Sequence, residues 1–164
     1  MNKEERGRQA SVEGFAYEHI AAGILMKKYQ NVSLVDLPLS PYDLIIVFKN
    51  EKSSEYIIRA QVKKARKSIS FTGGTRGGVD RSYRSDVKTY VQSTKTSDVI
   101  IGVHPLDDNY FELYFFPTIL VEKLNQKSIS ILKIKQFKNN YFFLENCKKY
   151  DLIIKEAKKL GFII

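Results

Sequence analysis

Cysteine, histidine and long hydrophobic runs are scarce in this chain of 164 residues. Cys147 is the only cysteine, so an internal disulfide is excluded and no cysteine cluster can hold a structural zinc. No apolar run approaches the roughly 18 residues that span a bilayer. The charged first residues lack the apolar core of a secretory signal. We therefore expect a cytoplasmic protein with no membrane partner.

The signatures of several enzyme classes are also missing. The two histidines, His19 and His104, are isolated and have no metal-ligand spacing. The sequence contains no nucleophilic triad and no dinucleotide fingerprint, and the glycine-rich segment 72–85 lacks the Gly-Lys-Ser/Thr of a P-loop. The length and the absence of repeats or linkers predict one domain over residues 1–164.

Positive charge is what the sequence has in excess. Lysine and arginine number 27 against 18 acidic residues, which gives a net charge of +9. This excess is typical of a surface that binds phosphates. A solvated basic surface without a specific partner is the alternative, and charge alone does not distinguish DNA from RNA.

Hydrophobic periodicity predicts an α/β fold with a central mixed β-sheet flanked by helices. The first expected helix covers residues 11–29, with Ser11 as its N-cap. Its apolar stripe comprises Phe15, Ala22, Leu25, Met26 and Tyr29. Strands are expected at 31–37, 43–48, 55–64, 97–103 and 110–116, a hairpin at 128–145, and further helices at 86–95, 118–124 and 147–160.

Polar side chains converge at one end of the expected sheet. Arg59, Gln61 and Lys63 alternate with apolar residues and share one face of their strand. Asp43 begins the preceding strand, so pairing of the two strands would bring a carboxylate, an amide oxygen and an ammonium together. The alternative is a surface hairpin that carries these side chains for solubility.

Glu18 lies within the apolar stripe of the first helix, whereas Glu13 is expected on the opposite, solvated side. A carboxylate on a buried stripe is costly unless it is paired or binds a cation. An ion pair with a lysine or arginine at the edge of the core is the alternative.

The segments "EHIAAGILMKKY", "SPYDLII" and "RAQVKKA" together resemble the PD-(D/E)xK nuclease superfamily, in particular its Q-x-K branch of small homing and restriction-type endonucleases. The resemblance covers residues 14–78 and implies a restriction-endonuclease-like core. It also implies Asp43 as the central metal ligand, with Glu18, Gln61 and the Val62 carbonyl as further ligands. Lys63 would orient or deprotonate the attacking water. Glutamine stands where most members carry a carboxylate, which puts two-metal chemistry in doubt.

Hard oxygen ligands of this kind select Mg²⁺, with Mn²⁺ as a substitute. Beside a metal in a partly dry cleft, Lys63 should have a lowered pKa, which suits a base. The glycine-rich basic segment that follows is expected to contact nucleic acid, although a solvated loop is the alternative. Its candidate contact residues are Lys64, Arg66, Lys67, Arg76, Arg81, Arg84 and Lys88.

The sequence therefore predicts a Mg²⁺-dependent DNA endonuclease of the homing, restriction or junction and repair type. Cutting both strands of a duplex favours a homodimer, with a tetramer as a further option. A non-catalytic nucleic-acid-binding module on the same fold is the second hypothesis. A structural protein with a buried Glu18–Lys63 ion pair is the third.

Overall fold

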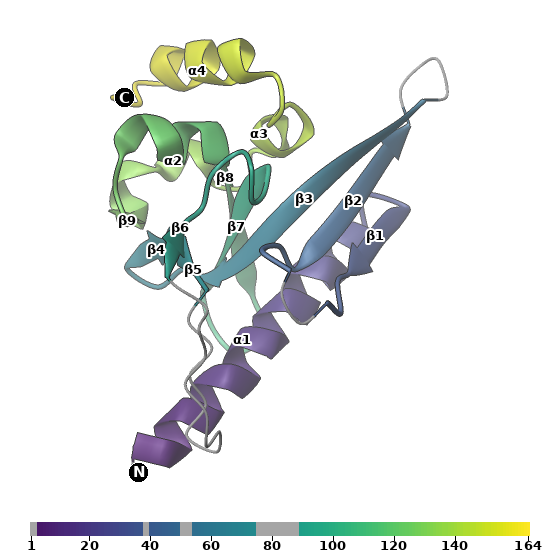
Figure 1. The fold of residues 1–164 in the computed structure, drawn as a ribbon, viewed down its shortest axis with the longest axis vertical. Helices are drawn as coiled ribbons and strands as arrows, with labels where there is room; N and C mark the ends of the chain where they lie inside the picture. The colour runs from purple at the N-terminus through teal and green to yellow at the C-terminus, as the bar shows by residue number, and fades with distance from the viewer. Residues whose placement is uncertain (1–2, 38–39, 50–53, 75–88) are drawn as a thin grey trace.

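The computed structural model describes residues 3–37, 40–49, 54–74 and 89–164 (Figure 1). Its central sheet has the strand order β1-β2-β3-β7-β8. β3 and β7 are parallel and the other neighbours are antiparallel, so the predicted mixed sheet is confirmed. The strands are β1 (Asn31–Leu34), β2 (Leu44–Lys49), β3 (Glu55–Lys64), β7 (Val99–Pro105) and β8 (Phe111–Pro117).

The first helix, α1 (Lys3–Met26), begins well before the predicted start. Ser11 is not its N-cap, because the Ser11 hydroxyl donates to the Gly7 carbonyl across 3.1 Å inside the helix. The predicted stripe was wrong for Phe15 and Met26, whose side chains are 63% and 51% exposed. The buried face is instead formed by Tyr17, Ala21, Ala22 and Leu25.

Helices lie at two ends of the sheet. α1 packs against β1, β3 and β7, and its N-terminal half projects beyond the sheet (Figure 1). The other helices gather at the opposite end of the molecule: α2 (Thr118–Leu124), α3 (Tyr141–Glu145) and α4 (Tyr150–Lys159). As predicted, Pro117 immediately precedes the first turn of α2, and Gly161, at φ +81°, follows α4.

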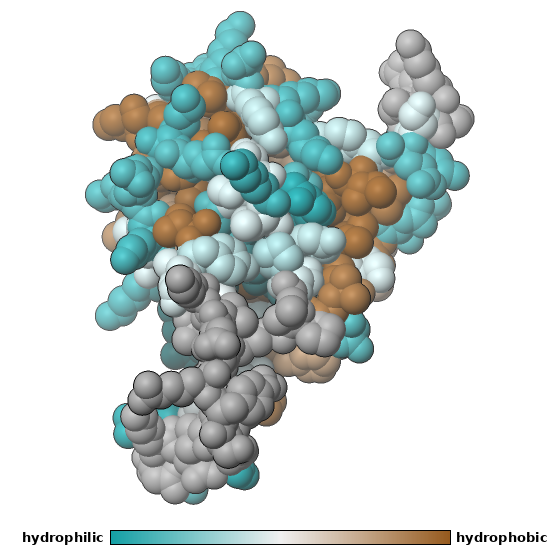
Figure 2. All heavy atoms as spheres, viewed as in Figure 1, coloured by the Kyte–Doolittle hydropathy of each residue, from teal (hydrophilic) through white to brown (hydrophobic). Residues whose placement is uncertain are grey.

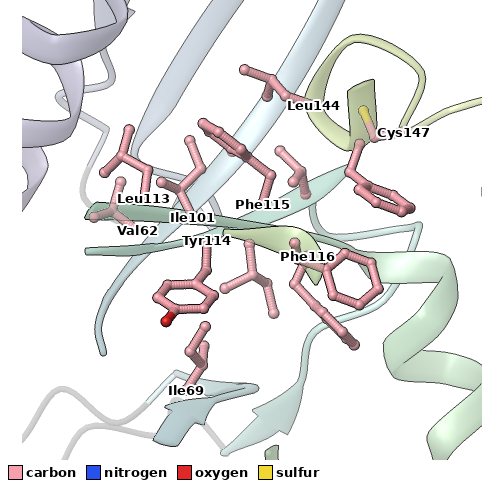
Figure 3. Close-up of a cluster of buried hydrophobic side chains, with 14 of the residues drawn as sticks. Val62, Ile69, Ile101, Leu113, Tyr114, Phe115, Phe116, Leu144 and Cys147 are labelled. Atoms are coloured by element: carbon pink, nitrogen blue, oxygen red, sulfur yellow. The ribbon is translucent and has the colours of Figure 1, made fainter. Parts of the chain in front are cut away.

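The hydrophobic core covers both faces of β7 and β8. Leu113 and Phe115 of β8 point to the side of Leu144 and Cys147, and Tyr114 and Phe116 point to the other side (Figure 3). Phe116 stacks there on Phe71, with ring centroids 5.2 Å apart. Burial of both faces explains why these two strands are continuous apolar runs in the sequence.

Two predicted elements were wrong. Residues 128–145 form no hairpin: β9 (Ser128–Ser130) pairs with β4 (Ser68–Ser70), and two 3₁₀ turns, η1 (Ile131–Lys133) and η2 (Lys135–Phe137), lead into α3. The Ser130 side chain accepts from the Leu132 amide and turns the chain out of the strand. The described part of 86–95 is not helical, since β6 (Tyr90–Val91) pairs with β5 (Thr72–Gly73).

The face drawn in Figure 2 is largely hydrophilic, with hydrophobic groups exposed over the β2–β3 hairpin. In this hairpin the Ile57 side chain of β3 is 46% exposed, whereas Ile58 beside it is fully buried. This contrast is the alternation expected of a hairpin that is covered on one face. Within the described segments, no helix has both the length and the hydropathy needed to cross a bilayer.

Candidate active site

β2 stops pairing with β3 before β3 ends. The last pair in the register is Leu44 with Ala60, and the Asp43 amide donates to the Ala60 carbonyl across 2.9 Å. Beyond this point β3 continues to Lys64 and still pairs with β7 on its other edge. The edge of β3 that faced β2 is therefore not covered by β2 where the Q-x-K segment lies.

The Asp43 carboxylate fills the position that β2 has left. Its Oδ2 accepts the Val62 amide across 2.7 Å and also accepts the Gln61 side-chain amide. In a strand, the N–H and C=O of one residue point to the same edge, so the Val62 carbonyl lies on this edge too. Gln61 Nε2 lies 3.3 Å from that carbonyl oxygen. Asp43, Gln61 and Val62 are therefore in contact at this edge, and two of them belong to the predicted convergence of Asp43, Gln61 and Lys63.

The Gln61 carboxamide turns its nitrogen toward Asp43. Its oxygen accepts from Gln92 Nε2 across 3.0 Å, on the side away from the carboxylate. The sequence predicts the Gln61 oxygen as a metal ligand, and in this arrangement that oxygen faces Gln92. Gln92 is buried and lies 31 residues away in sequence, so no spacing rule could have identified it.

Lys63 is half-buried on the same strand, two residues beyond Gln61. Burial lowers the pKa of its ammonium, and the negative charges of Asp43 and Glu18 oppose that shift. The direction is the one predicted from the sequence. A lysine with a lowered pKa has a larger neutral fraction at a given pH, so more of it is available to accept a proton.

Glu18 approaches from α1. Burial, and after it the charge of Asp43, raise the pKa of Glu18 from 4.5 to about 7, against the smaller opposing effects of His19 and Lys63. Among the ion pairs of the described residues, none joins Glu18 to Lys63. The buried Glu18–Lys63 pair of the third hypothesis is therefore not formed, and the Glu18 carboxylate remains under-compensated.

A hard cation fits this donor set. Two carboxylates near one another raise the cost of ionisation, and a divalent ion between them would remove that cost. Among the residues that the structure describes, no three His, Cys, Asp or Glu side chains gather into a metal cage. Mg²⁺ does not require such a cage, because it retains several waters and typically binds through one or two carboxylates and substrate phosphates.

The described basic residues continue β3 beyond the site. Lys64 is paired with Glu13 at 2.5 Å, and Arg66 lies 3.5 Å from the same carboxylate. Glu13 is thus an ion-pair partner and not the solvated residue expected from the sequence. The Arg66 side chain is 67% exposed, and Lys67 is also exposed. Arg76, Arg81, Arg84 and Lys88 lie outside the described residues.

A second polar cluster occupies the same face of β3. Asp98 is buried and accepts from the Arg59 backbone amide, while the Arg59 guanidinium binds both of its carboxylate oxygens at 2.8 and 3.2 Å. The Arg59 Nη1 and Nη2 also donate to the Lys95 and Thr94 carbonyls. Residues 92–98 are thereby held over Arg59 and Gln61, which brings Gln92 to the site.

The fold is similar to that of a known nuclease. The solved structure of the bacterial homing endonuclease I-Ssp6803I superposes with a TM-score of 0.51 at 14% identity, over 73% of this chain and 76% of that protein. No family model and no curated protein sequence matches the chain. At this level of identity the similarity concerns the fold, which is an α/β nuclease-like fold.

Proposed function

We propose that the protein is a metal-dependent DNA endonuclease that hydrolyses phosphodiester bonds in duplex DNA. The observation that carries the proposal is the Asp43 carboxylate at the open edge of β3, beside Lys63 and Glu18. The fold similarity to a homing endonuclease and the net charge of +9 support the same reading. The site belongs by this proposal to the PD-(D/E)xK type, with Gln61 and Lys63 as its Q-x-K pair.

Each residue of the site would have a role that follows from its chemistry. Asp43, Glu18 and the Val62 carbonyl offer hard oxygens to a cation, and Gln61 was expected to add its oxygen. Lys63 would accept a proton from the attacking water and offset negative charge that builds up on the phosphate. The water oxygen forms a new bond to phosphorus, the bond to the leaving oxygen breaks, and the leaving oxygen takes up a proton.

A bound Mg²⁺ would supply a Lewis acid at a non-bridging phosphate oxygen. Mn²⁺ should substitute, since both are small cations that prefer oxygen ligands. Because Glu18 has a pKa of about 7, it is partly protonated near neutrality. Cation binding should therefore release a proton and should weaken as the pH falls below about 7.

One chain carries one such site, and a duplex has two strands to cut. A homodimer with two-fold symmetry would present two sites to a palindromic or pseudo-palindromic target, and a tetramer could present two pairs. Sedimentation with and without DNA tests this assembly. A strict monomer under both conditions would remove the dimer from the proposal.

The test of function is cleavage of supercoiled and linear DNA with Mg²⁺, Mn²⁺ or EDTA. Wild type is compared with Asp43→Ala and Lys63→Ala, and with Asp36→Ala as a control at an exposed aspartate. We expect wild type and Asp36→Ala to cut DNA only when the metal is present. Asp43→Ala and Lys63→Ala should not cut. Equal cutting by all variants would assign the activity to another site or to a contaminant.

A non-catalytic nucleic-acid-binding module is the second candidate function. The observation that favours it is the orientation of Gln61, whose nitrogen and not its oxygen lies beside Asp43. Such a module would bind DNA with a steep salt dependence. It would cut no DNA, and Asp43→Ala would leave its binding unchanged.

A further inference from the structure

Gln92 connects the turn that carries Asp43 to the strand that carries Gln61. Its Nε2 donates to the Pro41 carbonyl across 3.1 Å and to Gln61 Oε1 across 3.0 Å. Pro41 lies two residues before Asp43 in the turn that leads into β2. A single buried carboxamide therefore spans both halves of the candidate site.

The orientation of Gln92 follows from its partners. A backbone carbonyl can only accept, so the Gln92 atom that faces Pro41 must be the nitrogen. The Gln92 oxygen accepts the hydroxyls of Thr96 and Ser97 at 2.6 and 2.8 Å. The Gln92 backbone amide is also bound, to the Phe71 carbonyl at 2.7 Å.

The orientation of Gln61 follows in turn. Because Gln92 presents an NH₂ group, the Gln61 atom that faces it must be the oxygen. The Gln61 nitrogen then faces the Asp43 carboxylate and the Val62 carbonyl, and both of these are acceptors. Rotating the carboxamide by a half turn would set two NH₂ groups against each other and two oxygens against each other, in a buried position where such contacts are costly.

We propose that Gln92 is a positioning residue that fixes Gln61 as a hydrogen-bond donor to Asp43. The catalytic purpose of this positioning rests on the proposed function, whereas the hydrogen bonds themselves do not. Under it, Gln61 holds the Asp43 carboxylate in place, and the cation is bound by the carboxylates and the Val62 carbonyl. Ligation by the Gln61 oxygen would require the bond to Gln92 to break.

The test follows the side-chain NH₂ hydrogens of Gln61 by NMR in the metal-free protein, with the signals assigned by their loss in Gln61→Leu. In wild type they should exchange with water at least about tenfold more slowly than those of the exposed Gln126. Gln92→Met and Gln92→Asn should both abolish that protection, the first by removing the carboxamide and the second by shortening its reach. Gln136→Met, the same change at a partly buried glutamine outside the site, should leave it intact.

Addition of Mg²⁺ provides the second arm. The Gln61 hydrogens should remain protected when Mg²⁺ shifts the backbone signals of Asp43 and Val62. Loss of protection on Mg²⁺ binding, fast exchange in wild type, or full protection in a folded Gln92→Asn variant would each overturn the proposal. Where a Gln92 variant fails to fold, fast exchange in wild type or loss of protection on Mg²⁺ binding would still overturn the proposal.

The two proposals fail separately. A protein that binds no Mg²⁺ and cuts no DNA, yet protects the Gln61 hydrogens in a Gln92-dependent manner, retains the positioning role and loses the nuclease function. Metal-dependent cutting by a wild-type protein whose Gln61 hydrogens are unprotected retains the nuclease function and loses the positioning role of Gln92.

Discussion

The Val62 amide donates to the Asp43 carboxylate across 2.7 Å at the point where β2 ceases to pair with β3. The carboxylate thus replaces a missing strand partner and is held in place by the backbone. A side chain fixed in this way is pre-organised, and catalytic groups work best when little reorganisation remains. The same contact also makes Asp43 part of the fold, so its substitution should be accompanied by a stability measurement.

Glu18→Gln should stabilise the metal-free protein at high pH. The folded pKa is about 7 against an ordinary 4.5, so the folded state holds the proton more tightly than the unfolded chain. The stabilising contribution of that proton is fully present below pH 4.5 and is lost as the pH rises through about 7. Since Glu18 is only half-buried, screening reduces the effect to about 1 kcal/mol.

Urea unfolding in EDTA at both ends of this pH range checks the Glu18 prediction. The variant and wild type should be equally stable below pH 4.5, and the variant more stable above about 7. Glu13→Gln serves as a control. Glu13 is ion-paired with Lys64, so this variant should be less stable than wild type at high pH. A Glu18→Gln variant that is less stable than wild type at high pH would contradict the assigned cost of ionisation.

Lys63→Met should slow cleavage while leaving cation binding intact. Loss of a group that stabilises transition-state charge costs on the order of 10²–10³ in rate. Removing a positive charge near Asp43 and Glu18 should not weaken Mn²⁺ binding, and it should strengthen that binding slightly. Single-turnover cleavage and Mn²⁺ titration by electron paramagnetic resonance measure the two effects independently.

Lys64→Met is the matched control for this prediction, because Lys64 is the next residue and its ammonium is paired with Glu13. It should alter the DNA concentration needed for cleavage more than the rate at saturation. Equal rates for wild type and Lys63→Met at saturating DNA would remove Lys63 from the chemistry.

Gly102→Ala should destabilise the fold without touching the candidate site. A methyl group at Gly102 in β7 would collide with the side chain of Ile69 and would lie 3.1 Å from the Ala65 Cβ. Overpacking of this kind costs about 1–3 kcal/mol. Gly23→Ala is the control, because nothing lies within 4 Å of the added methyl and an alanine inside α1 should stabilise by about 0.5–1 kcal/mol. Thermal unfolding of both variants gives the comparison, and a Gly102→Ala protein as stable as wild type would show that the Ile69 side chain can move aside at no cost.

Local pattern was sufficient for much of the sheet. The bounds of β3 match the predicted residues 55–64, because Ile58, Ala60 and Val62 alternate with polar residues on a half-covered strand. The expected pairing of this strand with the one before it correctly brought Gln61 to the Asp43 end of β2. Where the period of two held, side-chain direction followed from it.

The errors occurred where tertiary contacts outweigh local pattern. Phe15 was expected in the core because it fits a helical stripe, but the buried face of α1 runs through Tyr17, Ala21 and Leu25, and Phe15 packs on His19 in an exposed position. Residues 128–130 were expected in a local hairpin, but Ile129 pairs with Ile69, sixty positions earlier. Gln92 shows the same limit at the site, since its partners come from distant segments and share no periodicity with it.

Substitution of Arg66 and Lys67 should reduce the salt dependence of DNA binding. Both are exposed at the end of β3, directly beyond the candidate site. Each phosphate contact contributes about 0.9 to the slope of log affinity against log salt, so Arg66→Ala with Lys67→Ala should lower that slope by about 2. Lys155→Ala with Lys158→Ala is the control of equal charge, on α4 at the far end of the molecule (Figure 1). Fluorescence anisotropy over a salt series measures both slopes. A larger reduction of the slope by the α4 pair would place the DNA-binding surface at α4 and not at the end of β3. An equal reduction by both pairs would mean that affinity depends on net charge and not on one particular surface.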